Sequence, residues 1–289
     1  MRKTSLIKLS SAIIISSAIL LTGSCKKKTN EVDSETQSVV DNSICEQEFT
    51  QIQPTTNNLA VQTKGTSAKK MMEGFALAAS CDTLTYISGD TTYTNLLNPP
   101  IWEFNFGNCS AASNDGLLRS GKIIVKFLGR PKVSGNKTII KFQNYKVLKS
   151  SGIVSYNCDS IVVTTGASSA TSKSFNVDVV NAVCSGADWT IHFHSSKSIT
   201  IDNNGTPLVF ADDKTTVAGT SGGINRAGRK FDVVVNNIVK PNNWKHIVSG
   251  SLDLTPEGLS KRVVDYGNGA YDDLATYTVN GQTISFTLK

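Results

Sequence analysis

A serine inside a short glycine-rich run is the first candidate for chemistry. Gly219–Gly223 reads GTSGG and matches the G-x-S-x-G pattern around the nucleophilic serine of many hydrolases. In that site a strand precedes the serine, and the helix that follows it supports the oxyanion. Here Asn225–Gly228 and then a strand pattern follow, so no such helix is predicted. We therefore expect Ser221 to lie in a loop between strands, which leaves a hydrolase using the Gly219–Gly223 loop as a weak alternative.

Two histidines form the second candidate. His192 and His194 are two residues apart on a predicted strand, so both side chains point to the same face. Such a pair can bind a metal if a third ligand comes from a neighbouring strand. The alternating residues Ile191 and Phe193 are apolar and mark the core side. We therefore expect the histidines to face solvent, and they are a weak metal candidate.

A cluster of oxygen-bearing side chains near the C-terminus is the third candidate. Asp265, Asn268, Asp272 and Asp273 lie in a glycine-rich stretch, and oxygen ligands on a tight loop suit Ca²⁺. The spacing of an EF-hand is absent, and the same residue types form turns through local hydrogen bonds. The cluster is thus a weak calcium candidate. No resident cofactor and no catalytic residue is predicted.

The N-terminus carries the most specific signal. Three basic residues precede the apolar run Ser11–Leu21, which has the length of a signal peptide and is too short for a typical membrane-spanning helix. Small residues then precede Cys25, in an order that looks like a bacterial lipobox, although Thr22 stands where leucine is usual. We predict a signal peptide over 1–24 and acylation of Cys25, with palmitate among its chains. An ordinary signal peptide cleaved nearby is the alternative.

The residues after Cys25 predict how the domain is attached. Lys26–Val40 is polar and has no apolar period, so 25–40 is predicted to be the lipidated cysteine and a flexible tether. A short helix is expected over Asp41–Gln53, with Pro54 limiting its end, and a second over Ser67–Ala79. Together they make 41–80 a helical segment that packs on a sheet.

From Asp82 onward the apolar residues alternate with polar ones. This period of two is typical of antiparallel sheet with one buried and one wet face, and Asn280-Gly281 predicts a tight hairpin. The predicted class is all-β, as a large twisted sheet, a sandwich or a half-open barrel, with one or two short N-terminal helices. Residues 81–289 are expected to form a single antiparallel β domain.

Charge and cysteine content limit the functions further. The chain has 29 basic and 23 acidic residues, and three of the basic ones lie in the signal, leaving 26 and a net charge of +3. This balance does not indicate a nucleic-acid partner. An exported chain can form disulfides, but an odd number of cysteines besides Cys25 leaves at least one unpaired, and the pairing stays open. These five are Cys45, Cys81, Cys109, Cys158 and Cys184.

Several strings together resemble a group of uncharacterised β-rich envelope lipoproteins of Bacteroidetes-type bacteria. They are Arg119-Ser120-Gly121-Lys122-Ile123, Phe142-Gln143-Asn144-Tyr145, Ile247-Val248-Ser249-Gly250 and Asp265-Tyr266-Gly267-Asn268-Gly269. The resemblance covers roughly residues 41–289 and implies an envelope lipoprotein without an assigned activity. Relatives often have a cysteine where Trp244 and Tyr271 stand here. The resemblance therefore implies that these two side chains lie side by side.

The functional expectation is an envelope lipoprotein anchored to the outer membrane, on its periplasmic or its surface face. It would be a non-catalytic structural, adhesive or ligand-binding β module whose partner is a protein or a glycan. Tryptophans could stack against sugars if they are exposed, and the candidates are Trp102, Trp189 and Trp244, for each of which buried packing is the default expectation. The main alternative is a carrier of a hydrophobic ligand, held in a cavity between the sheet and the helix with Met71, Met72 and Phe75.

Overall fold

The computed structural model describes residues 33, 35–62, 82–107, 117–206, 212–244 and 246–288, and the side chains among them except those of 50–62. These residues belong to one compact unit, Asp33–Lys289. They contain one helix, α1 (Gln37–Gln62), and fourteen strands. The strands are β1 (Thr83–Ser88), β2 (Ile101–Gly107), β3 (Leu118–Phe127), β4 (Lys137–Lys149), β5 (Gly152–Asn157), β6 (Ser160–Ser168), β7 (Ser172–Ser185), β8 (Thr190–Asp202), β9 (Lys214–Ile224), β10 (Lys230–Pro241), β11 (Ser249–Pro256), β12 (Arg262–Asn268), β13 (Leu274–Val279) and β14 (Gln282–Thr287).

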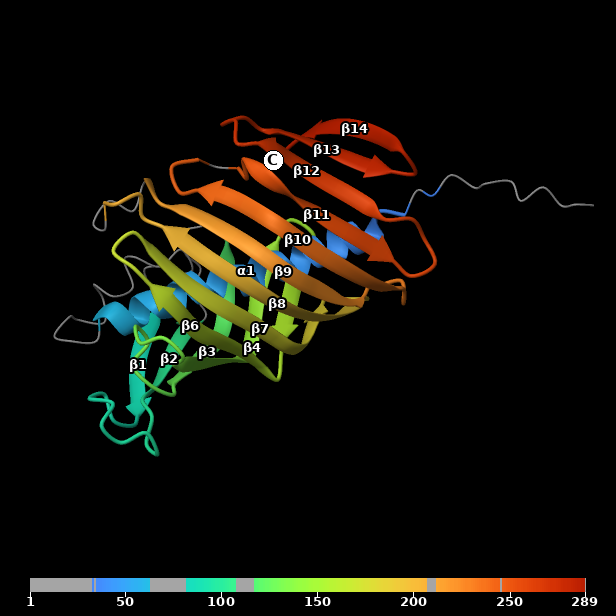
Figure 1. The fold of residues 1–289 in the computed structure, drawn as a ribbon. Coiled ribbons are helices and arrows are strands. Elements are labelled where there is room, and N and C mark those ends of the chain that lie inside the picture. The colour runs from blue at the N-terminus through green and yellow to red at the C-terminus, as the bar shows by residue number, and fades with distance from the viewer. Residues whose placement is uncertain are drawn as a thin grey trace, which may run out of the picture. The chain divides into compact units, whose positions relative to one another are not determined.

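All fourteen strands belong to one antiparallel sheet whose order follows the chain (Figure 1). The one departure is β6, which pairs with β4 and β7. Strands β5 and β6 pair with β4 in the same register. Lys146 lies opposite Ser155 of β5, and Ile140 lies opposite Ile161 of β6. Strands β5 and β6 therefore form one line, interrupted around Cys158. The all-β prediction is confirmed, and of the forms left open the structure has the single large sheet.

Local bulges bend this sheet. The register shifts where Gly121 of β3 lies beside Asn144 of β4, and again where Gly250 of β11 lies beside Asn237 of β10. Both asparagines have positive φ, 52° and 47°, and a Cβ on either glycine would lie within 2.4 Å of the neighbouring asparagine's carbonyl oxygen. Bulges increase local twist and curvature. In Figure 1 the strands β1–β4 run at a steep angle to β7–β12, and α1 crosses behind β7–β10.

The predicted alternation sets the core. Ile191 and Phe193 of β8 are buried, while the alternating residues His192 and His194 are exposed. Strands β6 and β7 show the same pattern. The buried face packs against α1, whose Cys45 and Phe49 belong to the hydrophobic core. At the C-terminal edge, Asn280 and Gly281 both have positive φ, 52° and 75°, and join β13 to β14 in the predicted hairpin.

The helix differs from its predicted bounds at both ends. It begins at Gln37, inside the stretch predicted as a tether, because the Glu35 carboxylate accepts hydrogen bonds from the backbone N–H and the hydroxyl of Ser38. The predicted stop at Pro54 is also wrong, since α1 continues to Gln62. Proline has a helical φ and removes one hydrogen bond, so it weakens a helix without always ending it. The second predicted helix, Ser67–Ala79, lies outside the described residues.

Candidate functional site

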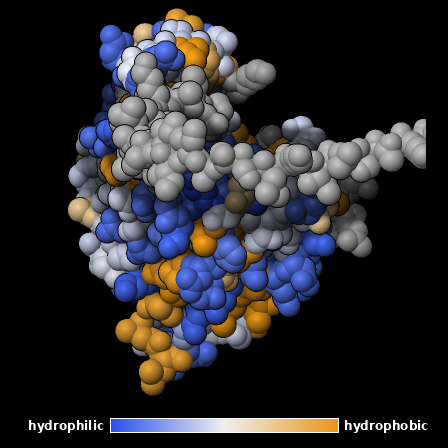
Figure 2. Space-filling view, turned by 90° about the vertical axis from the view of Figure 1, so that its right-hand side faces the viewer, coloured by the Kyte–Doolittle hydropathy of each residue, from blue (hydrophilic) through white to orange (hydrophobic). Residues whose placement is uncertain are grey.

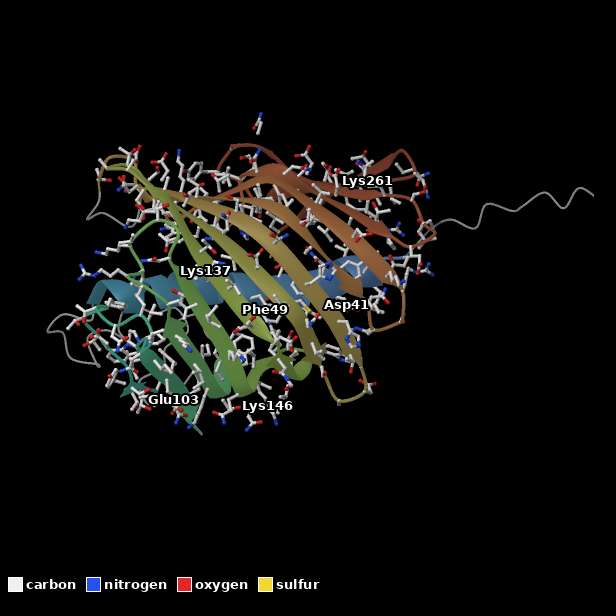
Figure 3. The ribbon with its side chains drawn as sticks, turned by 60° about the horizontal axis from the view of Figure 1, so that its bottom comes forward. Asp41, Phe49, Glu103, Lys137, Lys146 and Lys261 are labelled. Carbon is white, nitrogen blue, oxygen red and sulfur yellow. The ribbon has the colours of Figure 1, made fainter. Side chains whose placement is uncertain are left out.

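An aromatic cluster joins α1 to the sheet. The Phe49 ring, 1% exposed, lies 5.8 Å from the ring of Phe142, 5.7 Å from that of Phe193 and 6.0 Å from that of Tyr156, measured between centroids. These partners come from β4, β8 and β5. Figure 3 locates Phe49 on α1 where the helix crosses the strands. The space that a hydrophobic ligand would need at this point is therefore filled by side chains of the protein itself.

Three ion pairs hold the same helix to the sheet, and we call them the helix–sheet ion pairs. Asp41 pairs with Arg226 at 2.7 Å, Glu46 with Lys197 at 2.8 Å and Glu48 with Arg119 at 3.3 Å, each between side-chain N and O atoms. Both members of the Glu48–Arg119 pair are 0% exposed. Buried ion pairs cost desolvation energy, so they act mainly to fix one arrangement of the elements.

The Glu48–Arg119 pair includes a third group. The Tyr145 hydroxyl donates to Glu48 and accepts a hydrogen bond of 2.9 Å from Nε of Arg119. Burial, and next the charge of Glu48, raise the pKa of Tyr145 well above its usual range. The phenol therefore stays protonated and donates permanently. This arrangement binds one helix to β3 and β4 and offers no free base or nucleophile at that point.

The start of the described chain is clamped in the same way. The Arg262 guanidinium is fully buried in β12, where it pairs with Asp33 and lies 3.5 Å from Oε2 of Glu35. Its Nε also donates to the Glu35 backbone oxygen at 3.2 Å. The prediction of a free tether up to Val40 is thus wrong from Asp33 onward, because these acids are held by a buried cation.

The GTSGG run lies inside β9 and not in the loop that the sequence predicts. Ser221 is 4% exposed, and its hydroxyl donates to Oδ1 of Asn42 on α1 at 3.1 Å. A turn at Asn225–Gly228 and strand β10 follow. Position 223 requires glycine, because a Cβ there would come within 1.9 Å of the His192 carbonyl oxygen on the neighbouring strand. The serine thus faces the helix that covers the sheet.

The two histidines lie on the outer face, as their alternation predicts. His192 and His194 are exposed and border a hollow of about 550 Å³ with Asn181, Lys230 and Asp232. Across the described ranges, no three His, Cys, Asp or Glu side chains lie close enough together to hold a metal ion. The calcium prediction also uses the oxygen of Asn268, a residue type outside this observation, so it stays a prediction.

The C-terminal cluster instead borders a second hollow. Asp265, Asn268 and Asp272 line a space of about 290 Å³ between β12 and β13. Oδ1 of Asp265 accepts from the Gly267 N–H at 2.8 Å, and Oδ1 of Asp272 accepts from the Leu274 N–H at 3.0 Å. The fourth predicted residue, Asp273, accepts the Leu288 N–H at its backbone oxygen. These bonds give the rim a defined shape.

An aromatic pair adjoins this hollow. The rings of Trp244 and Tyr271 lie 5.8 Å apart with an interplanar angle of 58°, so the predicted proximity of the two side chains is confirmed. The indole N–H of Trp244 donates to the Asp272 carbonyl oxygen at 3.2 Å. Trp244 is half-buried and Tyr271 is 47% exposed, so the pair lies at the surface and not in the core. We call these two rings and the hollow the aromatic–acidic surface.

The other two tryptophans serve packing. Trp189 is half-buried under the Arg226 guanidinium, which lies 4.1 Å from its ring centroid, and Arg226 is itself paired with Asp41. Trp102 is half-buried and meets the Tyr86 ring edge-on at 5.4 Å. Among the three candidates, Trp244 is the one whose indole N–H contacts a residue that lines a hollow, Asp272.

A loop between β1 and β2 forms a second exposed feature. The Asp90 carboxylate accepts the backbone N–H groups of Thr92, Thr94 and Asn95 at 2.7–2.8 Å. Hydrogen bonds from the Thr92 side chain and then from this backbone hold the pKa of Asp90 below its usual range. The loop carries Leu97, which is 97% exposed. Figure 2 shows hydrophobic surface at the lower end of the molecule, the height of β1 in Figure 1.

Comparisons with protein-family models, curated proteins and solved structures find no match for this chain. In the described residues, no helix has the length and apolar character needed to cross a membrane. Cys25 lies outside the described residues.

The helix–sheet ion pairs were not predicted, although Asp41, Cys45, Glu48 and Phe49 have the spacing of a single helix face. This face does not form an apolar stripe, because two of its four residues are carboxylates, and the sequence pattern therefore does not mark it as buried.

Proposed function

We propose that this protein is a non-catalytic β module of the cell envelope, held on the outer membrane through an acylated Cys25. The observation that carries the proposal is the filled inner face of the sheet. Phe49 and the helix–sheet ion pairs occupy it, and the candidate nucleophile Ser221 is turned toward the helix. Recognition then takes place on the outer surface. The carrier alternative has its cavity under the Ser67–Ala79 helix, which lies outside the described residues, so this packing bears only on the space under α1.

We assign the ligand-binding role to the aromatic–acidic surface and a glycan as its ligand. A sugar ring has an apolar C–H face that packs on an aromatic ring, and hydroxyls that bond to carboxylates and amides. Trp244 and Tyr271 supply two angled rings, and Asp265 and Asn268 supply the polar groups of the adjoining hollow. Aromatic side chains that are apolar on the face and polar at the tip are typical of binding surfaces.

Replacing Tyr271 by alanine is expected to weaken glycan binding by about tenfold or more, which corresponds to about 1.4 kcal/mol. Binding of the full chain to a glycan array would identify the ligand, and titration with it would give the affinity. Tyr86→Ala is the matched control, since Tyr86 is 42% exposed and Tyr271 47%. Equal losses in the two variants, or no glycan bound by the unaltered chain, would refute the assignment.

Replacing Cys25 by serine is expected to abolish the anchor. In cells fed labelled palmitate, the unaltered protein should become labelled and the Cys25→Ser variant should not. Acyl chains buried at about 0.8 kcal/mol per CH₂ hold the unaltered protein on the bilayer. The variant should move from the membrane fraction to the soluble fraction. A Cys45→Ser variant is the control and should keep the label. Label that persists without Cys25 would contradict the anchor.

A further inference from the structure

Two buried thiols meet where α1 crosses the sheet. Cys45 of α1 and Cys184 of β7 are both 0% exposed, and their Sγ atoms lie 2.7 Å apart although 139 residues separate them in the chain. Both are free thiols in the structure. A disulfide bond is about 2.05 Å long, so the two sulfurs need to approach by only about 0.7 Å. The helix and the strand already hold the pair in contact.

The third described cysteine is less well placed. Cys158 follows β5 and is also buried. In the register of β5 with β7, Tyr156 faces Cys184, so Cys158 stands two residues further along and diagonal to Cys184. Diagonal neighbours in a sheet lie about 7–8 Å apart, whereas the Cβ atoms of a disulfide are about 3.5–4.5 Å apart. Cys184 therefore has a close partner in Cys45 and a distant one in Cys158.

We propose that Cys45 and Cys184 form a disulfide that covalently locks α1 onto the sheet when the chain folds in the presence of a disulfide oxidant. The inference rests on the proposed function for its setting, because the cell envelope, to which an exported protein is delivered, is oxidising and the cytosol is not. One thiolate attacks the oxidant's disulfide, and the second then displaces it from the mixed disulfide. Two thiols lose two protons and two electrons, and the oxidant's disulfide becomes two thiols.

The surroundings fix when this exchange takes place. Burial, and next the neighbouring Cys184 thiol, raise the pKa of Cys45 well above its ordinary value. The thiolate is the attacking form, so a folded and reduced chain reacts slowly. The first attack on the oxidant thus belongs to the folding chain, and the second thiol displaces the oxidant from the mixed disulfide as α1 closes over β7. The finished bond is then shielded from reductants by the same burial.

The test uses the full chain and oxidised glutathione as the probe. One sample is purified from cell-envelope membranes in detergent with free thiols blocked at lysis. A second is reduced, unfolded in urea and refolded with oxidised glutathione. Both are digested without reductant, and linked peptides are identified by mass spectrometry. The Cys158→Ser variant is the matched control and should keep the Cys45–Cys184 linkage, whereas Cys45→Ser should lose it.

We expect Cys45 linked to Cys184 in both samples, and a urea midpoint of the oxidised chain that falls when the bond is reduced. Linkage on refolding together with free thiols in the envelope sample would support the pairing and contradict the proposed export. Free Cys45 and Cys184 after refolding, or a link from either one to another cysteine, would overturn the inference. Because the linked peptide is read from the unaltered chain, a variant that fails to fold does not affect this result.

Discussion

Replacing Glu48 by alanine is expected to lower the free energy of unfolding by about 3–5 kcal/mol, because it removes the carboxylate from a fully buried cation. Arg119 and Glu48 are both 0% exposed, and water does not replace the lost charge. The Tyr145 hydroxyl would also lose the acceptor to which it donates. Unfolding in urea, followed by circular dichroism, measures the change.

The control for this prediction is an ion pair at the surface. Lys261 and Asp253 lie 2.9 Å apart, but their side chains are 55% and 23% exposed. Exposed pairs contribute about 0–1 kcal/mol, so Asp253→Ala should change stability by less than about 1 kcal/mol. If Glu48→Ala were as mild as Asp253→Ala, the pair would not be buried in solution, and α1 would not lie on the sheet as described.

Replacing Phe49 by alanine is expected to cost about 3–5 kcal/mol as well, for a different reason. The ring stacks on Phe142 and Phe193, and its removal leaves a cavity between helix and sheet that the neighbouring rings cannot fill completely. The urea midpoint should fall while the slope of the transition stays similar, since the same surface is exposed on unfolding.

Phe286→Ala provides the comparison for Phe49. Phe286 lies on the edge strand β14 and is 38% exposed, so its removal takes less apolar surface out of the core and should cost clearly less. A Phe49→Ala variant as stable as Phe286→Ala would mean that α1 is loosely attached. The inner face of the sheet beneath α1 would then be accessible.

The sequence predicted the strands far better than the helix. Alternation along β8 and the Asn280-Gly281 turn are local signals, and both predict the structure directly. The residues before α1 are held by a distant group, because Arg262 donates to the Glu35 backbone oxygen from 227 positions away. A local pattern does not contain such a partner, so the ordered stretch before α1 was not foreseen, whereas the early start of the helix has a local signal in the spacing of Glu35 and Ser38.

The candidate site shows the same division. The expectation that Trp244 and Tyr271 lie together did not come from a local pattern, since 27 positions separate the two residues and the structure places their rings 5.8 Å apart. The helix–sheet ion pairs were not expected. Asp41 and Glu48 read as ordinary solvent-facing acids on a helix, and only the curved sheet brings Arg226 and Arg119 to them. Charge type alone does not show whether a side chain is buried.

Helix α1 is an integral part of the β domain and packs against the inner face of its sheet. Amide hydrogen exchange followed by mass spectrometry tests this most directly, because opening α1 requires breaking its aromatic contacts and buried ion pairs together. We expect the amides of residues 41–49 to exchange about as slowly as those of β7 and β8. Complete exchange of residues 41–49 within minutes, with β7 and β8 still protected, would contradict this placement of α1.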